Sequence, residues 1–494
     1  MFDEITITNK TMELEDCRDA WFFDEAHDCW CLEDILYTDK ATTPKFQRLS
    51  IFVPAPYMSA PGIIDETGEK NGYTAKTVPI IFENNSAGYM QMPHVWLGGP
   101  RCYAEQYIEQ GYVYVTCGNR GHESRDSEGV FCGKSPINLV DLKTGIRFLR
   151  HNQAALPGDM EKIISVGWSA GGAMSTLLAV TGDNDNFNSY LRENGAFMDE
   201  SDAVYASQIY CPIVDLEHAD LAYEWLFSAD KENEASPAGP AGVMTPFEEA
   251  LSAKLKEQYI TYFNGLQLKH PETGKPLKLS EDGRDGSAYD YLMNKLNESA
   301  TVYLTKLAKG ELPERYSAAD YLAGKYTYMA PAPMGGPGGP DDTDKPDLMQ
   351  GHAGPGVGLR KPPFGEPGAP GKPMEPPTLG DLVSRPPKGV PYEPFTPPMM
   401  EVSGKDKSSW LTWDGEKAVI KDLDSYVLNH RRRMKPCTSF DILKNDSGEN
   451  KVFGTAEQPK MHFNANIADA IEELRDTFPE EYAAYYEEIG RAHV

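Results

Sequence analysis

No stretch of this 494-residue sequence is apolar for long enough to span a bilayer. The opening residues, MFDEITITNKTMELEDCRDAW, lack both a basic start and an apolar core, so they do not form a secretory signal. The eight cysteines are scattered, with no C-x-x-C pair and no zinc-site spacing, which favours free thiols in a reducing compartment. We therefore expect a cytoplasmic protein without a membrane anchor, a metal or an organic cofactor.

Positive charge is also scarce. Lys and Arg number 47 against 75 Asp and Glu, so the formal net charge is -28. A surface of that sign repels phosphate backbones and anionic lipid, which argues against nucleic-acid and membrane partners. Hydrophobic residues make up 40% of the chain and aromatic residues 11%, which is enough for a large packed core. The expected partner is therefore a small molecule, and the oligomeric state is not predicted.

The first 214 residues alternate between strand and helix patterns. Strands are predicted at KFQRLSIFVP (45–54), TVPIIFE (77–83), YVYVTCG (112–118), IISVG (163–167) and AVYASQIYCPI (203–213). Helices are predicted at RCYAEQYIEQG (101–111), INLVDLKTGIRFLRHN (137–152) and AGGAMSTLLAV (170–180). This alternation predicts a mainly parallel, doubly wound α/β sheet.

The character of the chain changes after Trp225. Residues 226–330 are polar and are predicted to be mostly helical. Residues 331–400 then hold 19 of the 38 prolines and 13 of the 44 glycines. Such a composition forms neither a helix nor a buried strand, so we predict a disordered or polyproline-like insertion over 329–400. A tolerated surface loop is favoured over a proline-rich partner-binding segment.

The stretch ISVGWSAGGAMS contains a G-x-S-x-G pattern, Gly167 to Gly171, around Ser169. In α/β-hydrolases this pattern forms a tight strand-to-helix turn that presents the nucleophilic serine. The pattern alone is weak, but here a strand is predicted before it and a helix after it. The alternative is a serine in a glycine-rich packing turn. A second oxyanion donor is expected after an earlier strand, and Gly88 in ENNSAGY fits that position.

Three blocks together resemble the bacterial tannases, α/β-hydrolases that cleave gallate esters. They are LPGDMEKIISVGWSAGGAMS, YCPIVDLEHADLAYEW (210–225) and RMKPCTSFDILKNDSGENKVFG (433–454), and the similarity runs from about residue 45 to 465. The resemblance implies a large lid inserted after the YCPI strand. We therefore expect an α/β-hydrolase core over 1–214 and a lid domain over 215–487.

The resemblance also implies site residues. The nucleophile would be Ser169, and the oxyanion would be bound by the amides of Gly88 and Ala170. Lys435 and Glu449 would contact the galloyl hydroxyls, and Ile213 would contact the ring. A lysine donates to phenolic hydroxyls and a carboxylate accepts from them, which favours hydroxylated aromatic acids.

Other interpretations of these residues remain. Lys435 also fits a solvated basic run, HRRRMK, and Glu449 a turn in DSGEN. The sequence departs from the family at Trp168, where a small or polar residue is usual, and at Gly448, where a proline is common. Both differences bear on the shape of the acyl pocket.

The catalytic acid and histidine are not evident. None of the ten histidines suits the role well, and His218 in LEHAD is the best internal candidate. The last residues, IGRAHV, are the translation of the sequencing-adapter string ATC GGA AGA GCA CAC GTC. We therefore expect residues 488–494 to be an artefact. We also expect the last core strands, with the Asp and His, to lie in the intact gene.

The sequence thus predicts a serine esterase that acts on galloyl or related hydroxybenzoyl esters through an acyl-enzyme on Ser169, and a chain that is inactive or nearly so without its base. One alternative is a feruloyl-type or general carboxylesterase with the same fold. Another is a noncatalytic binding protein that has the hydrolase fold and truly lacks the acid and base.

Overall fold

The computed structural model describes residues 12–98, 102–233, 242–312, 316–325, 327–329, 399–401, 410–444 and 446–489. The chain divides into two compact units. The described residues of the first unit are 12–98, 102–214 and Lys451–Met461, and the other described residues, from Asp215 onward, form the second. The lid expected over 215–487 thus differs from the second unit, because Lys451–Met461 belongs to the first. Most of the insertion predicted over 329–400 lies outside the described residues, as do residues 490–494.

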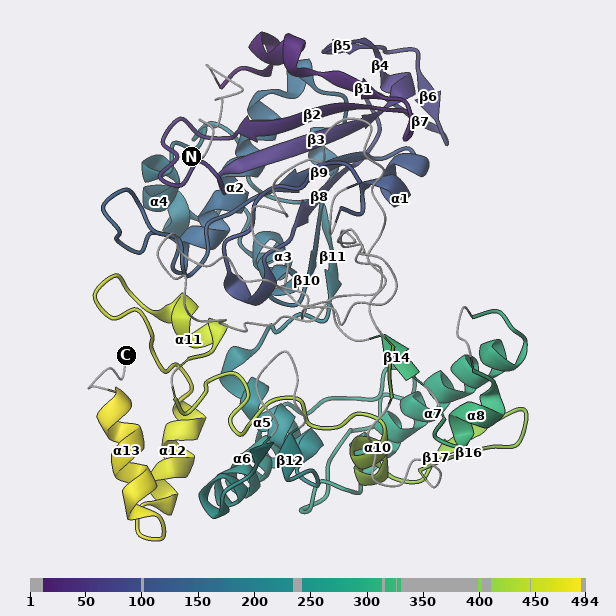
Figure 1. Ribbon diagram of the computed structural model, residues 1–494, viewed down its shortest axis with the longest axis vertical. Helices are drawn as coiled ribbons and strands as arrows, with labels where there is room; N and C mark the ends of the chain where they lie inside the picture. The colour runs from purple at the N-terminus through teal and green to yellow at the C-terminus, as the bar shows by residue number, and fades with distance from the viewer. Residues whose placement is uncertain are drawn as a thin grey trace, which may run out of the picture. The chain divides into compact units, whose positions relative to one another are not determined.

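A seven-stranded sheet crosses the first unit in the order β1-β2-β3-β9-β8-β10-β11 (Figure 1). Its strands are β1 (Phe22–Asp24), β2 (Cys29–Leu36), β3 (Arg48–Pro54), β9 (Val113–Cys117), β8 (Ile80–Asn84), β10 (Ile163–Trp168) and β11 (Ala206–Tyr210). From β9 to β11 all neighbours are parallel, whereas β1, β2, β3 and β9 pair antiparallel. Because β2 also runs in the direction of β9, only β1 and β3 oppose the other five strands. The mainly parallel sheet is therefore confirmed, with an antiparallel side that the sequence did not predict.

Helices cover both faces of this sheet. On one face, α2 (Ile137–His151) and α3 (Ala170–Val180) pack on a core that includes Ile80, Phe82 and Val115. On the other face, α1 (Ala104–Glu109) packs on Phe52, Ile81 and Tyr114. All residues of β8 and β9 are buried. Parallel strands with both faces covered have continuous apolar runs in their sequences, and for this reason β8 and β9 could be predicted. The remaining elements of this unit are α4 (Asn188–Glu193), the short pairs β4 (Met58–Ala60) with β5 (Ile63–Ile64) and β6 (Glu69–Lys70) with β7 (Tyr73–Thr74), and the 3-10 turns η1 (Leu14–Ala20), η2 (Ala55–Tyr57), η3 (Ala87–Tyr89), η4 (Gln153–Ala155), η5 (Met160–Lys162) and η6 (Asp185–Phe187).

The last strand of the sheet, β11, is covered far less than its neighbours. Ala206, Gln208 and Tyr210 are exposed, and the two residues between them are only half-buried. Nearby apolar side chains are exposed as well: Leu177 by 41%, Val180 by 70%, Tyr205 by 67% and Val214 by 65%. Among the described residues β11 pairs with β10 alone, so its other side is an open edge.

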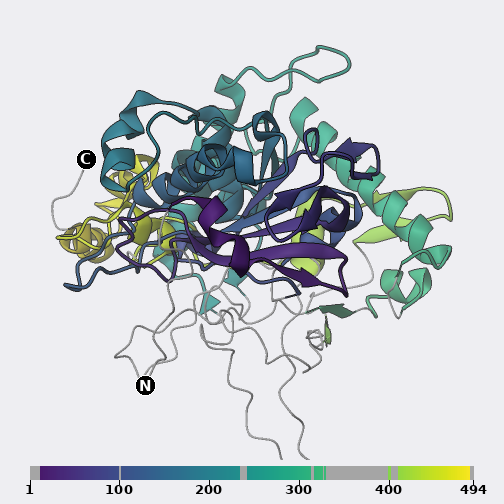
Figure 2. The same ribbon diagram turned by 90° about the horizontal axis from the view of Figure 1, so that it is seen from above.

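The second unit is mostly helical, as predicted for 226–330. One group of helices, α5 (Leu216–Phe227), α6 (Pro246–Gly265), α12 (Ala465–Leu474) and α13 (Pro479–Ile489), packs around Leu221, Leu251 and Ile471. A second group consists of α7 (Ser287–Ala308), α8 (Ala318–Leu322) and α10 (Leu423–Asn429), which lie beside the hairpin of β16 (Leu411–Trp413) and β17 (Ala418–Ile420) (Figure 2). Among the described residues of this unit, two further antiparallel pairs join β12 (Glu232–Asn233) to β13 (Gly242–Val243) and β14 (Thr327–Met329) to β15 (Met399–Glu401).

Candidate active site

Ser169 lies at the turn between β10 and α3, as the G-x-S-x-G pattern predicted. Its backbone has φ 54° and ψ −121°, a conformation that residues other than glycine rarely adopt. A Cβ at position 167 would lie 2.2 Å from the carbonyl oxygen of Gly171, so only glycine fits there. The Ser169 amide donates to the carbonyl of Tyr210 at 3.0 Å, which ties the turn to β11. The strained turn holds a half-exposed serine at the start of a helix.

The two predicted oxyanion donors lie on adjoining segments. Ala170 is the first residue of α3, whose N-terminal amides carry a partial positive charge. Gly88 lies in η3, just after β8, and has φ 55°. No atom lies within 4 Å of the position that a Cβ at residue 88 would take, so a ligand can approach the backbone. Since η3 packs against α3, both segments border the same turn. The oxyanion role itself stays a prediction.

Trp168, the departure from the family pattern beside the nucleophile, stacks on Tyr210 and packs at a tilt on Tyr103. Its ring centroid lies 4.9 Å from that of Tyr210 and 4.8 Å from that of Tyr103. It belongs to the apolar cluster that α1 covers. Ile213, the predicted ring contact, follows β11 and is half-buried.

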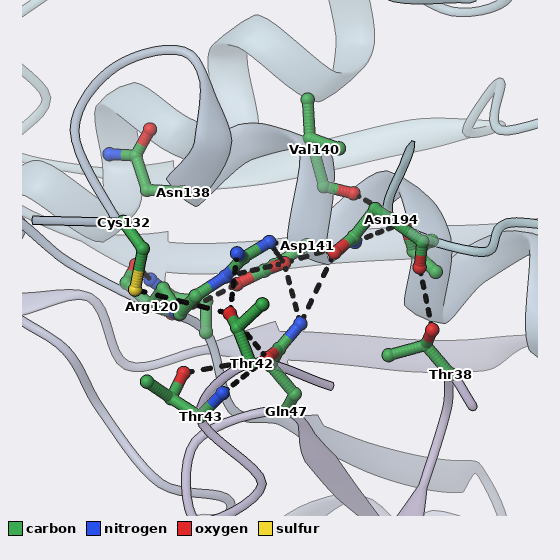
Figure 3. A network of polar contacts seen from close by, with 12 residues as sticks. Thr38, Thr42, Thr43, Gln47, Arg120, Cys132, Asn138, Val140, Asp141 and Asn194 are labelled. Atoms are coloured by element: carbon green, nitrogen blue, oxygen red, sulfur yellow. Dashed lines mark hydrogen bonds and ion pairs between the residues drawn. The ribbon is translucent and has the colours of Figure 1, made fainter. Parts of the chain in front are cut away.

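A buried polar network anchors the loop that follows β9 (Figure 3). Arg120 donates to Asp141 of α2 through its amide at 2.8 Å, its Nε at 2.9 Å and a terminal nitrogen at 2.7 Å. Asn194 joins the pair by accepting from Arg120 at 2.7 Å and donating to Asp141 at 3.1 Å. Gln47, which precedes β3, donates to Asn194 at 3.2 Å. Asp141 is fully buried and Arg120 is 5% exposed, so the charges are shielded from water and depend on each other.

This loop in turn supports the segment that carries Gly88. The amide of His122 donates to the carbonyl of Tyr89 at 3.0 Å, and Met92 and Asn119 exchange backbone hydrogen bonds at 2.9 and 3.0 Å. A Cβ at Gly121 would lie 2.0 Å from the amide of Gln91, so the two backbones are in direct contact. The network of Arg120 and Asp141 therefore holds the second candidate oxyanion segment through one intervening loop.

The histidines of the first unit are engaged away from the nucleophile. The described ones bond to carboxylates or hydroxyls elsewhere: His27 to Asp24 and Glu105, His94 to Ser50 and Asp34, His122 to Glu123, and His151 to Glu13. Burial lowers the pKa of His122 despite the adjacent Glu123. The hydrogen bond from His122 lowers the pKa of Glu123 to about 2. No described histidine of this unit hydrogen-bonds Ser169.

In the second unit, α5 positions the backbone around Lys435. The hydroxyl of Tyr223 accepts from the amides of Met434 and Lys435, both at 3.1 Å. Glu224 forms a buried ion pair with Arg433 at 2.6 Å. The Nζ of Lys435 lies 3.9 Å from the centroid of the Phe440 ring, which is a cation–π distance. The family-like blocks at 210–225 and 433–454 are thus in direct contact, a link that no local sequence pattern reveals.

Asp220, one turn before Tyr223, holds the same loop from its other end. Its carboxylate accepts from the amides of Ser439, Phe440 and Asp441 at 2.7, 2.9 and 3.1 Å. Burial raises the pKa of Asp220 to about 6, although these amides act in the opposite direction.

The raised pKa of Asp220 leads to a prediction on stability. The folded protein binds a proton at Asp220 below pH 6, whereas the unfolded chain does so only near the ordinary value of 3.8. This group therefore increasingly favours the folded state as the pH falls from 6 towards 4, and its contribution is lost as the pH rises through 6. Relative to Asp220→Asn, wild type should gain about 1 kcal/mol in unfolding free energy between pH 7.5 and pH 5. Urea unfolding of both proteins at the two pH values measures this gain, and a difference that does not vary with pH would contradict the assignment.

Glu449 lies at the start of α11 (Gly448–Phe453) and is 8% exposed. The hydroxyl of Ser447 accepts from the amide of Asn450 at 2.9 Å, and the Asn450 side chain donates to Asp441 at 2.6 Å. Asp441 thereby connects the Glu449 helix to the loop that α5 organises. Among the described residues, no hydrogen bond or ion pair joins Lys435 to Glu449.

Two aspartate–histidine pairs occur among the described residues of the second unit. His218, the best internal candidate for the base, bonds Asp215 at 2.9 Å and stacks on Tyr262 with ring centroids 3.6 Å apart. His462, for which the sequence predicts no role, bonds the buried Asp441 at 2.5 Å. The residues are 21 positions apart and share no motif, so no sequence signal marked the pair. Since Asp441 also accepts from the amides that follow His462, the pair fixes the chain ahead of α12.

The described residues contain no group of three or more His, Cys, Asp or Glu side chains placed to hold a metal ion. Within the same residues, no helix combines the length and the apolar character needed to cross a membrane.

The sheet order, the flanking helices and the serine turn define an α/β-hydrolase. The family model BD-FAE, an α/β-hydrolase domain, matches residues 99–236. No curated protein matches the sequence.

Among solved structures, this chain resembles bacterial tannases over most of its length. It is 25% identical to the native tannin acyl hydrolase from Lactobacillus plantarum, over 96% of this chain and 83% of that chain, with a TM-score of 0.64. A tannin acyl hydrolase in complex with ethyl gallate is 27% identical over 90% of this chain and 75% of that chain, with a TM-score of 0.62. The tannase of Fusobacterium nucleatum is 23% identical over 97% of this chain and 85% of that chain, with a TM-score of 0.65. At that identity the likeness shows the fold alone. At the level of the family, the two tannin acyl hydrolases and the BD-FAE match support a carboxylic ester hydrolase.

Proposed function

We propose that the protein hydrolyses esters of galloyl and related hydroxybenzoyl acids through Ser169. The observation that carries the proposal is the strained turn at Ser169, which presents a half-exposed hydroxyl at the N-terminus of α3. Such strain persists only where the surrounding structure enforces it, and it is typical of catalytic nucleophiles. The eight free cysteines support the cytoplasmic location that we also propose.

In the proposed reaction the Ser169 hydroxyl attacks the ester carbonyl. The developing oxyanion accepts from the amides of Ala170 and Gly88, and the alcohol leaves as the acyl-serine forms. Water then attacks the acyl-serine and releases the acid. The first step requires a base to take the serine proton, and the described histidines of the first unit do not fill that role.

The preference for hydroxylated aromatic acids rests on Lys435 and Glu449, with Ile213 as an apolar contact to the ring. Two of the tannin acyl hydrolases that the chain resembles are complexes with ethyl gallate and with 3,4-dihydroxybenzoate. Both ligands carry adjacent phenolic hydroxyls. An ammonium group donates to such hydroxyls and a carboxylate accepts from them. The packing of Lys435 on Phe440 and the capped helix at Glu449 restrict both side chains, which favours a defined hydroxyl pattern.

The proposal is tested by hydrolysis of methyl gallate, methyl ferulate and methyl benzoate, each with wild type and Ser169→Ala, in buffer that contains imidazole as a free base. We expect saturable, Ser169-dependent release of gallic acid, with methyl gallate preferred. Equal rates on all three esters would instead indicate a general carboxylesterase, and a preference for methyl ferulate a feruloyl-type enzyme. Binding of methyl gallate without any Ser169-dependent hydrolysis would indicate a noncatalytic binding protein.

The roles of Lys435 and Glu449 lead to a second prediction. In the same imidazole buffer, Lys435→Ala and Glu449→Ala should each lower turnover of methyl gallate while sparing p-nitrophenyl acetate, which has no phenolic hydroxyl on its acyl group. Loss of one charged contact to a substrate hydroxyl should cost about 2–4 kcal/mol, or roughly 30- to 1000-fold in kcat/KM.

The ratio of kcat/KM for the two substrates is the measurement, because a folding defect lowers both values together. Lys444→Ala is the matched control, since Lys444 is an exposed lysine of the same loop. A ratio that stays at the wild-type value in both site variants would show that neither residue selects the galloyl group.

A further inference from the structure

Asn84, the last residue of β8, reaches across to both arms of the serine turn. Its side chain is fully buried. The Nδ2 group lies 3.3 Å from the carbonyl oxygen of Val166 in β10, 3.2 Å from that of Gly171 in α3, and 2.9 Å from the hydroxyl of Ser175 in α3. Since carbonyl oxygens only accept, the nitrogen and not the oxygen of the amide must face them. One side chain therefore links the strand before the turn, the helix after it and the neighbouring strand.

The backbone ladder between β8 and β10 ends just before this point. The last paired residues are Glu83 and Val166, whereas β8 continues to pair with β9 as far as Asn84 and Cys117. Beyond Val166, β10 leads into the turn at Ser169 and no longer runs beside β8. The bond from the Asn84 side chain to the Val166 carbonyl thus continues the connection where the ladder has stopped.

The contact between Asn84 and α3 is also close. A Cβ at Gly171 would lie 2.8 Å from Asn84 Oδ1 and 3.0 Å from its carbonyl oxygen, so the first turn of α3 rests directly on this residue. The chain then passes from Asn84 through Asn85 and Ser86 into η3, which carries Gly88. The distance between the amides of Gly88 and Ala170 therefore depends on how the end of β8 is held against α3.

We propose that Asn84 is a positioning residue that sets the spacing of the two amides for the oxyanion. The inference rests on the proposed function, because it assumes that Ser169 is the nucleophile and that Gly88 and Ala170 bind the oxyanion. A site that stabilises a developing charge depends on donors fixed before the reaction begins. Asn84 should therefore matter for the tetrahedral species and much less for binding of the planar ester.

Phenylboronic acid tests this directly, because it mimics the tetrahedral species without needing a general base. The Ser169 oxygen bonds to boron, the hydroxyl proton passes to solvent, and boron becomes a tetrahedral anion. Wild type, Asn84→Asp and Ser175→Ala are titrated with this probe and, separately, with methyl gallate. Asn84→Asp keeps the shape of the side chain but points an oxygen at two carbonyl oxygens, which cannot donate to it, and Ser175→Ala removes only the shortest contact. Asn85→Asp is the matched control, since Asn85 is the next residue and is half-buried.

We expect Asn84→Asp to weaken boronate binding at least ~10-fold, since loss of one oxyanion donor costs about 10²–10³-fold in rate. Ser175→Ala should have a smaller effect in the same direction. Methyl gallate binding should change less than ~2-fold in both, and Asn85→Asp should match wild type in both titrations. Equal boronate affinity in Asn84→Asp and wild type would overturn the inference, as would an equal loss for boronate and methyl gallate.

Ser169→Ala separates this inference from the proposed function. If Ser169→Ala binds the boronate as well as wild type does, the proposed nucleophile is wrong. In that case, amide hydrogen exchange tests the positioning role of Asn84 independently of the nucleophile. Faster exchange in Asn84→Asp at residues 85–90 and 169–175, with exchange in α2 unchanged, would support its positioning role. Unchanged exchange in those two segments, or faster exchange throughout the chain, would reject it.

Discussion

Hydrolysis of p-nitrophenyl acetate by the wild-type chain should be slow and should rise at least ~10-fold when imidazole is added. General-base assistance contributes on the order of 10²–10⁴-fold, and a free base recovers part of what is missing. The prediction follows from the first unit, where His27, His94, His122 and His151 are all bonded to groups other than Ser169. A small free imidazole can reach the half-exposed serine and take its proton.

Imidazole also hydrolyses this ester in solution, so the relevant quantity is the saturable rate above that background. Ser169→Ala should remove the saturable part completely while leaving the unfolding midpoint close to that of wild type. Fast hydrolysis without imidazole would mean that the chain supplies its own base. His218→Ala is then the decisive variant, because His218 already bonds Asp215 in the way that a catalytic histidine bonds its acid.

Arg120→Leu should lower the unfolding free energy by about 3–5 kcal/mol. The substitution leaves the carboxylate of Asp141, which is fully buried, without its cation and without the three hydrogen bonds that the guanidinium donates. The backbone amide of residue 120 remains, so Asp141 keeps one of the contacts from that position. The network also holds the loop beside Tyr89. The segment that carries Gly88 should therefore become more mobile when the fold is destabilised.

Urea unfolding monitored by tryptophan fluorescence measures the loss. Arg125→Leu is the matched control, since Arg125 is an exposed arginine of the same loop, and it should cost less than about 1 kcal/mol. Adding Asp141→Asn to Arg120→Leu should recover part of the stability, because the buried charge is then removed. If the double variant were less stable than Arg120→Leu, the cost would come from packing rather than from the unpaired carboxylate.

The serine turn could be predicted because its determinants are contiguous in the chain. A buried strand, a glycine without room for a Cβ and a helix of small residues all fall between Ile163 and Val180. Strand β2 escaped prediction for an equally local reason. A register shift between Leu32 and Ile35 breaks the alternation of side chains that a regular strand would show.

The surroundings of the candidate site could not be predicted in the same way. The loop that carries Lys435 is held by Asp220 and Tyr223, more than 200 positions earlier in the chain. Asn84 meets Gly171 and Ser175 across more than 80 positions. Such partners are brought together by the fold, and a single sequence contains no periodicity or spacing that pairs them. Resemblance to a family indicated which blocks matter, but not which side chains hold them.

The open side of β11 has a practical consequence for work with this polypeptide. Its unpaired backbone amides and carbonyls, together with the exposed Tyr205, Val180 and Val214, can template a strand from another molecule. Light scattering of concentrated samples should therefore increase with time, and brief heating should produce turbidity before the bulk of the helices melts. The strong negative charge opposes this at low ionic strength, and added salt screens it. Dilute, low-salt buffer is thus the condition under which the chain should remain dispersed.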